Sequence, residues 1–282
     1  LIASMVAMLA EMNVTCALLA PTGRAARILG NKMQQQLGKD AIPAATLHGA
    51  IYRFDEAVVN EKALDENDPG IRWFFRLRTD APVVSVLIID EASMVGDRKS
   101  GDHQIQFGSG RLLSDLVQYA RLGQGRAPGQ SPTRIIFVGD AAQLPPVGQN
   151  VSPALAPGYL EHRFGLRVVV RDLVEVVCQA ADSAILARAR EIRDAIAGND
   201  FRRFALQADA ADICQVKPAA VIDTLVAGIR EKKSCVAIVH SNREALEFNR
   251  AVRARLWGHE QLPVQCGDLL LVNRQSLLHG FN

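Results

Sequence analysis

The sequence predicts an α/β protein in which helices cover both faces of a parallel sheet. Three short apolar runs, at residues 15–21, 83–90 and 134–140, lack the polar–apolar alternation of a half-exposed strand. Helix-forming segments separate the three runs, and buried parallel strands joined by helices have this pattern. Because such sheets bind ligands at the carboxyl ends of their strands, we expect a functional site at that edge.

Local composition predicts the helices next to these strands. Residues 1–12 and 22–38 are rich in helix formers, and Pro21 closes the first strand before the second helix begins. Residues 111–123 predict another helix, between the second and third strands.

The texture of the sequence changes after Val151, where residues 152–165 contain the prolines and glycines of a linker. We therefore expect a first domain over residues 1–165 and a second, incomplete domain over residues 166–282. In the second domain we predict strands over 166–176 and 234–239, helices over 182–198 and 241–258, and the start of a β-rich insertion near 264–282.

Composition excludes some classes of protein and leaves others open. With 49% hydrophobic and 22% charged residues, the chain has the make-up of a globular protein. A net charge of +2 permits a nucleic-acid partner without arguing for one. The five cysteines form no C-x-x-C pair and predict reduced thiols in a cytoplasmic protein. No apolar run approaches the roughly 18 residues of a membrane span, so we expect no membrane partner.

Two adjacent acids, Asp90 and Glu91, follow the second apolar run. An acid at a strand end suits Mg²⁺, which one carboxylate holds through water. A second acid beside it suits activation of the water that attacks a γ-phosphate. The alternative is a strand that ends in a solvated turn.

The third apolar run ends in Gly139 and Asp140, and Gln143 precedes two prolines. Glycine lets the backbone pass close to a ligand, and the prolines fix the path of the chain beyond it. A Gln held in this way suits a hydrogen bond to a γ-phosphate and its water. The alternative is an ordinary β-turn with a proline kink, although two such stretches at adjacent strand ends favour a nucleotide site.

Several motifs resemble those of superfamily-one DNA helicases of the RecD-like, 5′-to-3′ branch, which includes the exonuclease V alpha subunit. DEASM and VGDAAQLPPVG resemble motifs II and III. LLAPTGRAARIL is similar to motif Ia, ATLHGAIY to motif Ib and DLVEVVCQAADSAIL to motif IV. The resemblance implies two RecA-like parallel-sheet domains, the second incomplete, that hydrolyse ATP with Mg²⁺ while moving along single-stranded DNA in repair or recombination.

The resemblance also assigns roles to single residues. It implies that Asp90 binds Mg²⁺, Glu91 activates water and Gln143 senses the γ-phosphate. It implies ATP contacts for Asp90, Glu91, Gly139, Asp140, Gln143 and Gln179, and DNA contacts for Pro21, Thr22, Gly23, Arg24, Thr46 and His48. Hydroxyl, backbone N–H and guanidinium groups also suit phosphates and sugars on physical grounds. The alternatives are a helix-surface charge for Arg24 and an ordinary core or loop histidine for His48.

The sequence departs from the family pattern in two places. No G-x-x-x-x-G-K-[ST] phosphate loop occurs, and we expect this chain to begin downstream of that loop. Cys178 stands before Gln179 where motif IV would have an arginine that reaches the γ-phosphate, and Arg171 and Arg188 are possible substitutes. A second hypothesis is therefore a degenerate RecA-like module that binds DNA or a protein, such as a nuclease or repair partner, without hydrolysing ATP.

One aromatic stretch, Trp73 to Phe75 between Arg72 and Arg76, has two interpretations. The rings suit stacking on bases, which is worth roughly 1–3 kcal/mol per base. Core packing with solvated neighbours is the commoner role for such a stretch.

Overall fold

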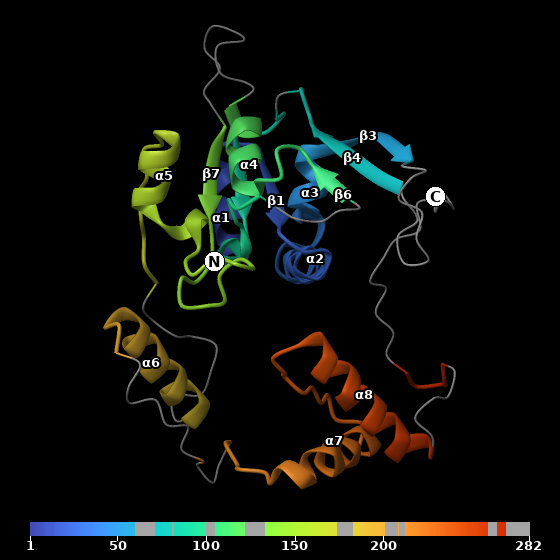
Figure 1. Cartoon of the computed structure of the whole chain (residues 1–282). Coiled ribbons are helices and arrows are strands. Elements are labelled where there is room, and N and C mark those ends of the chain that lie inside the picture. Colours follow the sequence, from blue (N-terminus) through green and yellow to red (C-terminus); the bar gives the residue numbers. More distant parts are fainter. Residues whose placement is uncertain are drawn as a thin grey trace, which may run out of the picture. The chain divides into compact units, whose positions relative to one another are not determined.

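The structure is a computed structural model that describes residues 1–59, 71–80, 82–99, 105–121, 133–173, 183–200, 208, 212–258 and 264–268. The chain divides into two compact units, Leu1–Glu175 and Val176–Asn282 (Figure 1). The domain boundary expected between residues 165 and 166 stays a prediction. Within the described ranges, no helix has both the length and the apolar character needed to cross a membrane.

A four-stranded parallel sheet forms the centre of the first unit. Its strands are β1 (Cys16–Ala20), β2 (Ala44–Thr46), β5 (Val86–Ile89) and β7 (Arg134–Phe137), in the order β2-β1-β5-β7. Leu19 is in register with Ile89, and Ile89 with Phe137, so the three predicted strands end at one edge. The α/β fold class is confirmed, and the sheet is consistent with a RecA-like domain.

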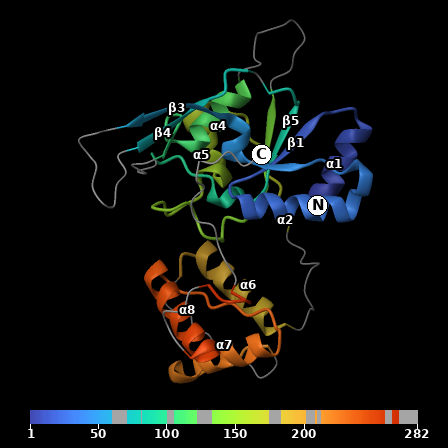
Figure 2. The same cartoon turned by 90° about the vertical axis from the view of Figure 1, so that its right-hand side faces the viewer.

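Alternation along the strands divides the core in two. Leu18 and Ile88 face α1 (Ile2–Glu11) and α2 (Gly23–Leu37), and this cluster is called the α2-side core. Their neighbours Leu19, Leu87 and Ile89 face the opposite way. The cluster that these neighbours join, the α4-side core, contains residues of α3 (Leu47–Ile51), α4 (Leu112–Arg121) and α5 (Pro157–Phe164). Figure 2 shows α1 and α2 on one side of the strands and α4 and α5 on the other.

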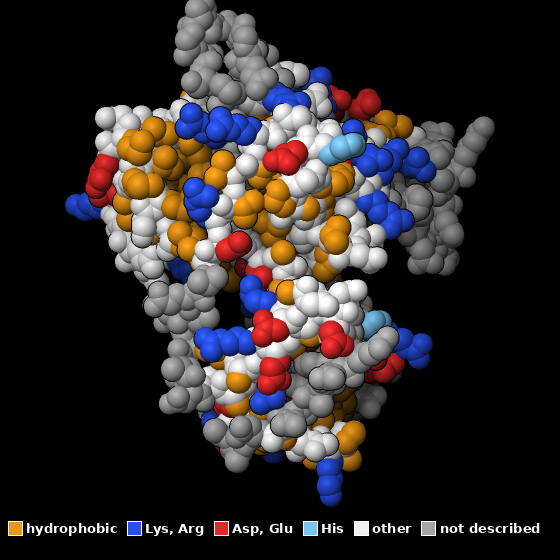
Figure 3. All heavy atoms as spheres, turned by 90° about the vertical axis from the view of Figure 1, so that its left-hand side faces the viewer, with side chains coloured by type: hydrophobic (Ala, Val, Ile, Leu, Met, Phe, Trp, Pro, Cys, Tyr) orange, Lys and Arg blue, Asp and Glu red, His pale blue; other side chains and the backbone are white. Residues whose placement is uncertain are grey.

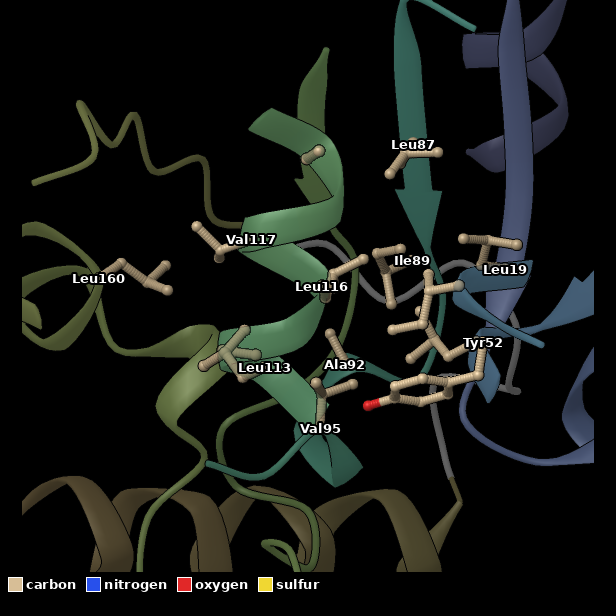
Figure 4. Packing of buried hydrophobic residues seen from close by; sticks show 14 residues of the cluster. Leu19, Tyr52, Leu87, Ile89, Ala92, Val95, Leu113, Leu116, Val117 and Leu160 are labelled. Carbon is tan, nitrogen blue, oxygen red and sulfur yellow. The ribbon is translucent and has the colours of Figure 1, made fainter. Parts of the chain in front are cut away.

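The sequence of α4 explains its buried position. Leu113, Leu116, Val117 and Ala120 are buried and recur at the spacing of one helix face. Figure 4 shows Leu116 pointing from α4 toward Ile89 and Val117 pointing toward Leu160, and all these side chains belong to the α4-side core. The helix therefore packs as one body against the sheet.

A second sheet, which the sequence interpretation missed, stands beside the first. It consists of β3 (Tyr52–Val59), β4 (Ile71–Leu77) and β6 (Ile105–Phe107), with β3 antiparallel and β6 parallel to β4. Phe75 stacks on Phe107 with 4.8 Å between ring centroids, at the border of the α4-side core. Trp73 instead contacts the exposed Phe54, with 6.0 Å between centroids. The aromatic stretch is thus part core and part surface.

The described part of the second unit contains α6 (Ala184–Ala197), α7 (Val221–Arg230) and α8 (Asn242–Trp257). The predicted helices are confirmed, and α8 begins with the predicted capping box, in which Ser241 and Glu244 exchange hydrogen bonds. Gly258 ends α8 with φ at 79°, a conformation that glycine adopts readily.

Two strand predictions outside the central sheet are wrong. Residues 166–173 and 234–239 form no strand, and the Val236 and Ile238 side chains are 81% and 94% exposed. An apolar run becomes a strand only beside a neighbour that takes up its backbone hydrogen bonds. Among the described residues, no strand pairs with either run. Of the predicted β-rich insertion, only residues 264–268 are described, and they form no strand.

Candidate functional site

The acid pair lies where β5 leaves the sheet. The Asp90 N–H donates to the Leu19 carbonyl of β1 at 2.9 Å, and the Ala92 N–H donates to the Val138 carbonyl beyond β7 at 2.9 Å. Glu91 has φ 51° and ψ 40°, a left-handed conformation that costs a residue other than glycine about 1–2 kcal/mol. Hydrogen bonds on both sides of Glu91 hold this sharp turn, so both half-buried acids stay at the edge of the sheet.

The segment after β7 passes directly over residues 90–97, which carry the acids and are called the acid segment. A Cβ atom on Gly139 would lie 3.1 Å from the backbone nitrogens of both Ala92 and Ser93. Gly139 is therefore needed because the backbone there passes close to the acid segment. The sequence interpretation had instead explained this glycine by the close approach of a ligand. The Val138 N–H also donates to the Ile89 carbonyl at 2.8 Å, which continues the pairing of β7 with β5.

Gln143 lies on a tight turn with an exposed side chain. The Asp140 carboxylate accepts the Ala142 N–H at 2.9 Å, and the Asp140 carbonyl accepts the Gln143 N–H at 3.1 Å. The Leu144 and Val147 side chains that follow are 85% and 100% exposed. Figure 3 shows hydrophobic side chains gathered on one face of the first unit. The amide of Gln143 is accessible to a ligand.

The acid segment packs against residues 139–149, which are called the Gln143 segment. A Cβ atom on Gly96 would lie 2.4 Å from Nε2 of Gln149 and 3.0 Å from Cβ of Pro146. Arg98 Nη1 donates to the Gly148 carbonyl at 2.9 Å. The two segments are therefore in direct contact.

Asp90 and Glu91 fit a magnesium ion that arrives with a nucleotide better than a metal held by protein alone. In the ranges that the structure describes, no group of three or more His, Cys, Asp or Glu residues is arranged to hold a metal ion. Mg²⁺ keeps several waters and takes one or two carboxylates together with phosphate oxygens. The half-buried Asp90 carboxylate matches that donor set, and Glu91 beside it suits activation of the attacking water.

The candidate nucleic-acid residues gather at the ends of β1 and β2. Ala20 is in register with Thr46, which brings the segment Pro21–Arg24 beside the start of α3. Thr22 and Thr46 are both helix N-caps, and each Oγ1 accepts a backbone N–H at 3.1 Å. Their hydroxyl hydrogens remain able to donate to a phosphate. Gly23 and Arg24 are exposed.

His48 lies one residue inside α3, against aromatic rings. Its ring centroid is 4.7 Å from that of Phe107, in an edge-on contact, and 5.7 Å from that of Tyr52. Burial lowers the pKa of His48 below its ordinary value of 6.5. At neutral pH the imidazole is therefore uncharged and offers a partner a hydrogen bond or a ring face. The structure gives His48 both a packing role and a position at the candidate surface.

We expect the pKa of His48 to make the protein less stable as the pH falls below about 6.5. The unfolded chain then binds a proton that folded His48 resists, and the free energy of unfolding decreases until the pH reaches the folded pKa. Thermal unfolding at pH 7.5 and 5.5 should show a smaller loss for His48→Gln than for the unmodified protein. His162→Gln, at an exposed histidine of α5, is the control, and an equal loss in His48→Gln would contradict the assignment.

Gln179 and Cys178 lie outside the described residues, so the predicted motif IV contact stays a prediction. The two possible substitutes for the missing arginine both have local partners. Arg171 donates to the Val170 carbonyl at 2.8 Å, and Arg188 forms an ion pair with Glu191 at 2.8 Å.

Comparison with protein families identifies the first part of the chain. A family model described as an AAA domain matches residues 1–149. This range contains the acid pair, Gln143 and the candidate residues at the ends of β1 and β2, but not Gln179. No curated protein matches the chain.

Proposed function

Because the chain belongs to the AAA domain family through residues 1–149, we propose that it is the motor part of a RecD-like helicase or translocase. The family implies a nucleotide-binding, helicase-like P-loop domain that commonly uses Mg²⁺. The proposal adds that the nucleotide is ATP and that hydrolysis drives movement along single-stranded DNA.

One observation carries the proposal. The Asp90 N–H donates to the Leu19 carbonyl at 2.9 Å, and Leu19 is two residues before Pro21. The acid pair and the candidate nucleic-acid segment are thus neighbours on paired strands, β5 and β1. A nucleotide hydrolase whose acid pair is hydrogen-bonded to the strand that leads into its nucleic-acid segment is suited to coupling the two activities.

In the proposed reaction, Glu91 accepts a proton from the water that attacks the γ-phosphorus. The bond from the γ-phosphorus to the bridging oxygen breaks, and ADP and phosphate leave. Asp90 would hold Mg²⁺, which would neutralise charge on the phosphates. Gln143 donates its amide N–H to the γ-phosphate.

The proposed DNA contacts use small polar groups. The hydroxyls of Thr22 and Thr46 donate to phosphate oxygens, and the Arg24 guanidinium supplies positive charge. A Cβ atom on Gly23 would have no heavy atom within 4 Å, so the backbone there is open to close approach by a sugar or phosphate. None of these groups selects a base, which is appropriate for a protein that moves along DNA.

The test is steady-state ATP hydrolysis by the full-length protein, with and without single-stranded DNA, and with single-stranded RNA as the comparison. We expect DNA to raise the turnover rate. Mg-ATP hydrolysis that DNA does not change would contradict the proposal that the protein is a DNA motor.

A second candidate function is a clamp that binds DNA without turnover, and Cys178 favours it because a thiol cannot replace the charge of an arginine finger. For this candidate, we expect DNA binding with no ATP hydrolysis in the unmodified protein. Cys178→Arg should then create hydrolysis if the remaining site is sound.

A further inference from the structure

The acid segment is anchored to α4 by a buried carboxylate. Asp97, which is 3% exposed, accepts the backbone N–H of Ser114 at 2.9 Å and the Ser114 hydroxyl at 2.6 Å. Its second oxygen accepts the Tyr159 hydroxyl at 2.7 Å. A buried charge is costly unless it is hydrogen-bonded, so these contacts fix the end of the acid segment.

The Tyr52 ring beside His48 is anchored to Asp115, the residue that follows Ser114 in α4. Asp115, which is 2% exposed, accepts the Tyr52 hydroxyl at 2.7 Å and the Ser109 N–H at 3.0 Å. Figure 4 shows this hydroxyl pointing from the side of β3 toward α4. Burial and Asp115 raise the pKa of Tyr52 far above its ordinary value, so the hydroxyl remains a donor.

The backbone at Gly108 packs closely against the contact between Tyr52 and Asp115. Gly108 has φ +43°, and a Cβ atom there would lie 2.3 Å from the Asp115 carboxylate and 2.7 Å from the Tyr52 ring. The two rings contact each other, with 5.7 Å between the centroids of Tyr52 and His48. A displacement of Asp115 therefore displaces the ring that packs on His48.

Ser114 and Asp115 are consecutive residues of a ten-residue helix whose apolar face is buried. The Leu113 N–H also donates to the Gly96 carbonyl at 3.0 Å, and Gly96 is the residue that packs on Pro146 and Gln149. Contiguous packed and hydrogen-bonded atoms thus join the Gln143 segment, the acid segment, α4 and His48. Neighbouring residues of one helix that are bonded to two different segments are a physical means of coupling two sites.

We propose that Ser114 and Asp115 are positioning residues through which α4 couples the acid pair to the nucleic-acid surface at His48. This inference rests on the proposed function. When the acid segment shifts during the nucleotide cycle, Asp97 moves Ser114, and Asp115 moves Tyr52 and the ring of His48. Binding of DNA at His48 acts on the acids by the same route, since such coupling is reciprocal.

The experiment is a double-mutant cycle in the full-length protein. Tyr52→Phe removes only the hydroxyl that Asp115 accepts and keeps the ring that packs on His48. Ser114→Ala removes the hydroxyl bond to Asp97. We expect each variant to lower the maximal DNA stimulation of ATP hydrolysis about three- to tenfold, with the DNA-free rate and the half-saturating DNA concentration unchanged. The DNA stimulation of the double variant should be close to that of the more impaired single variant, because both changes interrupt the same connection.

Tyr119→Phe is the matched control, because it removes a hydroxyl from the same helix that none of these bonds uses. Unchanged stimulation in Tyr52→Phe and Ser114→Ala, additive losses in the double variant, or a rise in half-saturating DNA alone would each overturn the inference. An unmodified protein that hydrolyses ATP without DNA stimulation overturns the proposed function as well. Normal stimulation of the unmodified protein, with no effect of the variants, overturns only the inference.

Discussion

Glu91→Gln is expected to lower DNA-stimulated ATP hydrolysis by the full-length protein roughly 10²- to 10⁴-fold, the range for loss of a general base. The amide has nearly the shape of the carboxylate but cannot accept the proton of the attacking water. The left-handed backbone at position 91 is equally unfavourable for Glu and Gln, so the substitution should not change the stability of the fold. The measurement is the maximal turnover rate at saturating DNA and Mg-ATP.

A matched control separates this effect from a change of net charge. Glu161→Gln removes one negative charge from an exposed position on α5, and its rate should equal that of the unmodified protein. Nucleotide binding by Glu91→Gln should be retained, because the phosphate contacts do not depend on the base. An undiminished rate in Glu91→Gln would reject its catalytic role and leave the interpretation of a solvated turn.

Leu116→Ala should lower the free energy of unfolding of the first unit by about 2–5 kcal/mol. The Leu116 side chain is fully buried in the α4-side core, and close packing around it allows little collapse into the cavity. Urea unfolding followed by tryptophan fluorescence measures the loss. A Trp257→Phe background makes Trp73 the only reporter, and Trp73 belongs to the first unit.

Leu144→Ala provides the comparison for the core substitution. The same chemical change at a side chain that is 85% exposed should alter the free energy of unfolding by less than about 0.5 kcal/mol. Equal losses at the two leucines would show that α4 is not packed in solution as described. Because α4 also carries Ser114 and Asp115, that result would remove the rigid element on which the coupling depends.

Some of the wrong expectations share one physical cause. Residues 234–239 have the β-branched, apolar composition of a buried strand, yet the Val236 and Ile238 side chains are exposed. Conversely, β3 and β4 were not expected, although Tyr52, Phe54 and Trp73 are residues that favour strands. Composition indicates which segments are able to form strands, whereas pairing depends on neighbours distant in sequence.

The candidate site was predictable to the extent that it depends on strand ends. Pro21, Asp90 and Asp140 were placed at the carboxyl edge because each ends an apolar run, and parallel strands bring such ends together. Asp97 was missed because a single acid after a glycine has no distinctive local pattern. The Thr22 and Thr46 caps were also missed, although each threonine precedes a helix-forming segment and thereby gave a usable signal.

The sequence by itself determined three of the four central strands (β1, β5 and β7), the helices α1, α2 and α4, and the edge where the acids lie, because hydrophobic runs and helix signals act over a few residues. Only the tertiary structure decided what those residues contact. Gly139 proved to be fitted to the backbone of Ala92, and Tyr52 to the carboxylate of Asp115 across 63 positions of sequence. Contacts of this kind depend on how packed elements meet in space, which no local pattern of residues encodes.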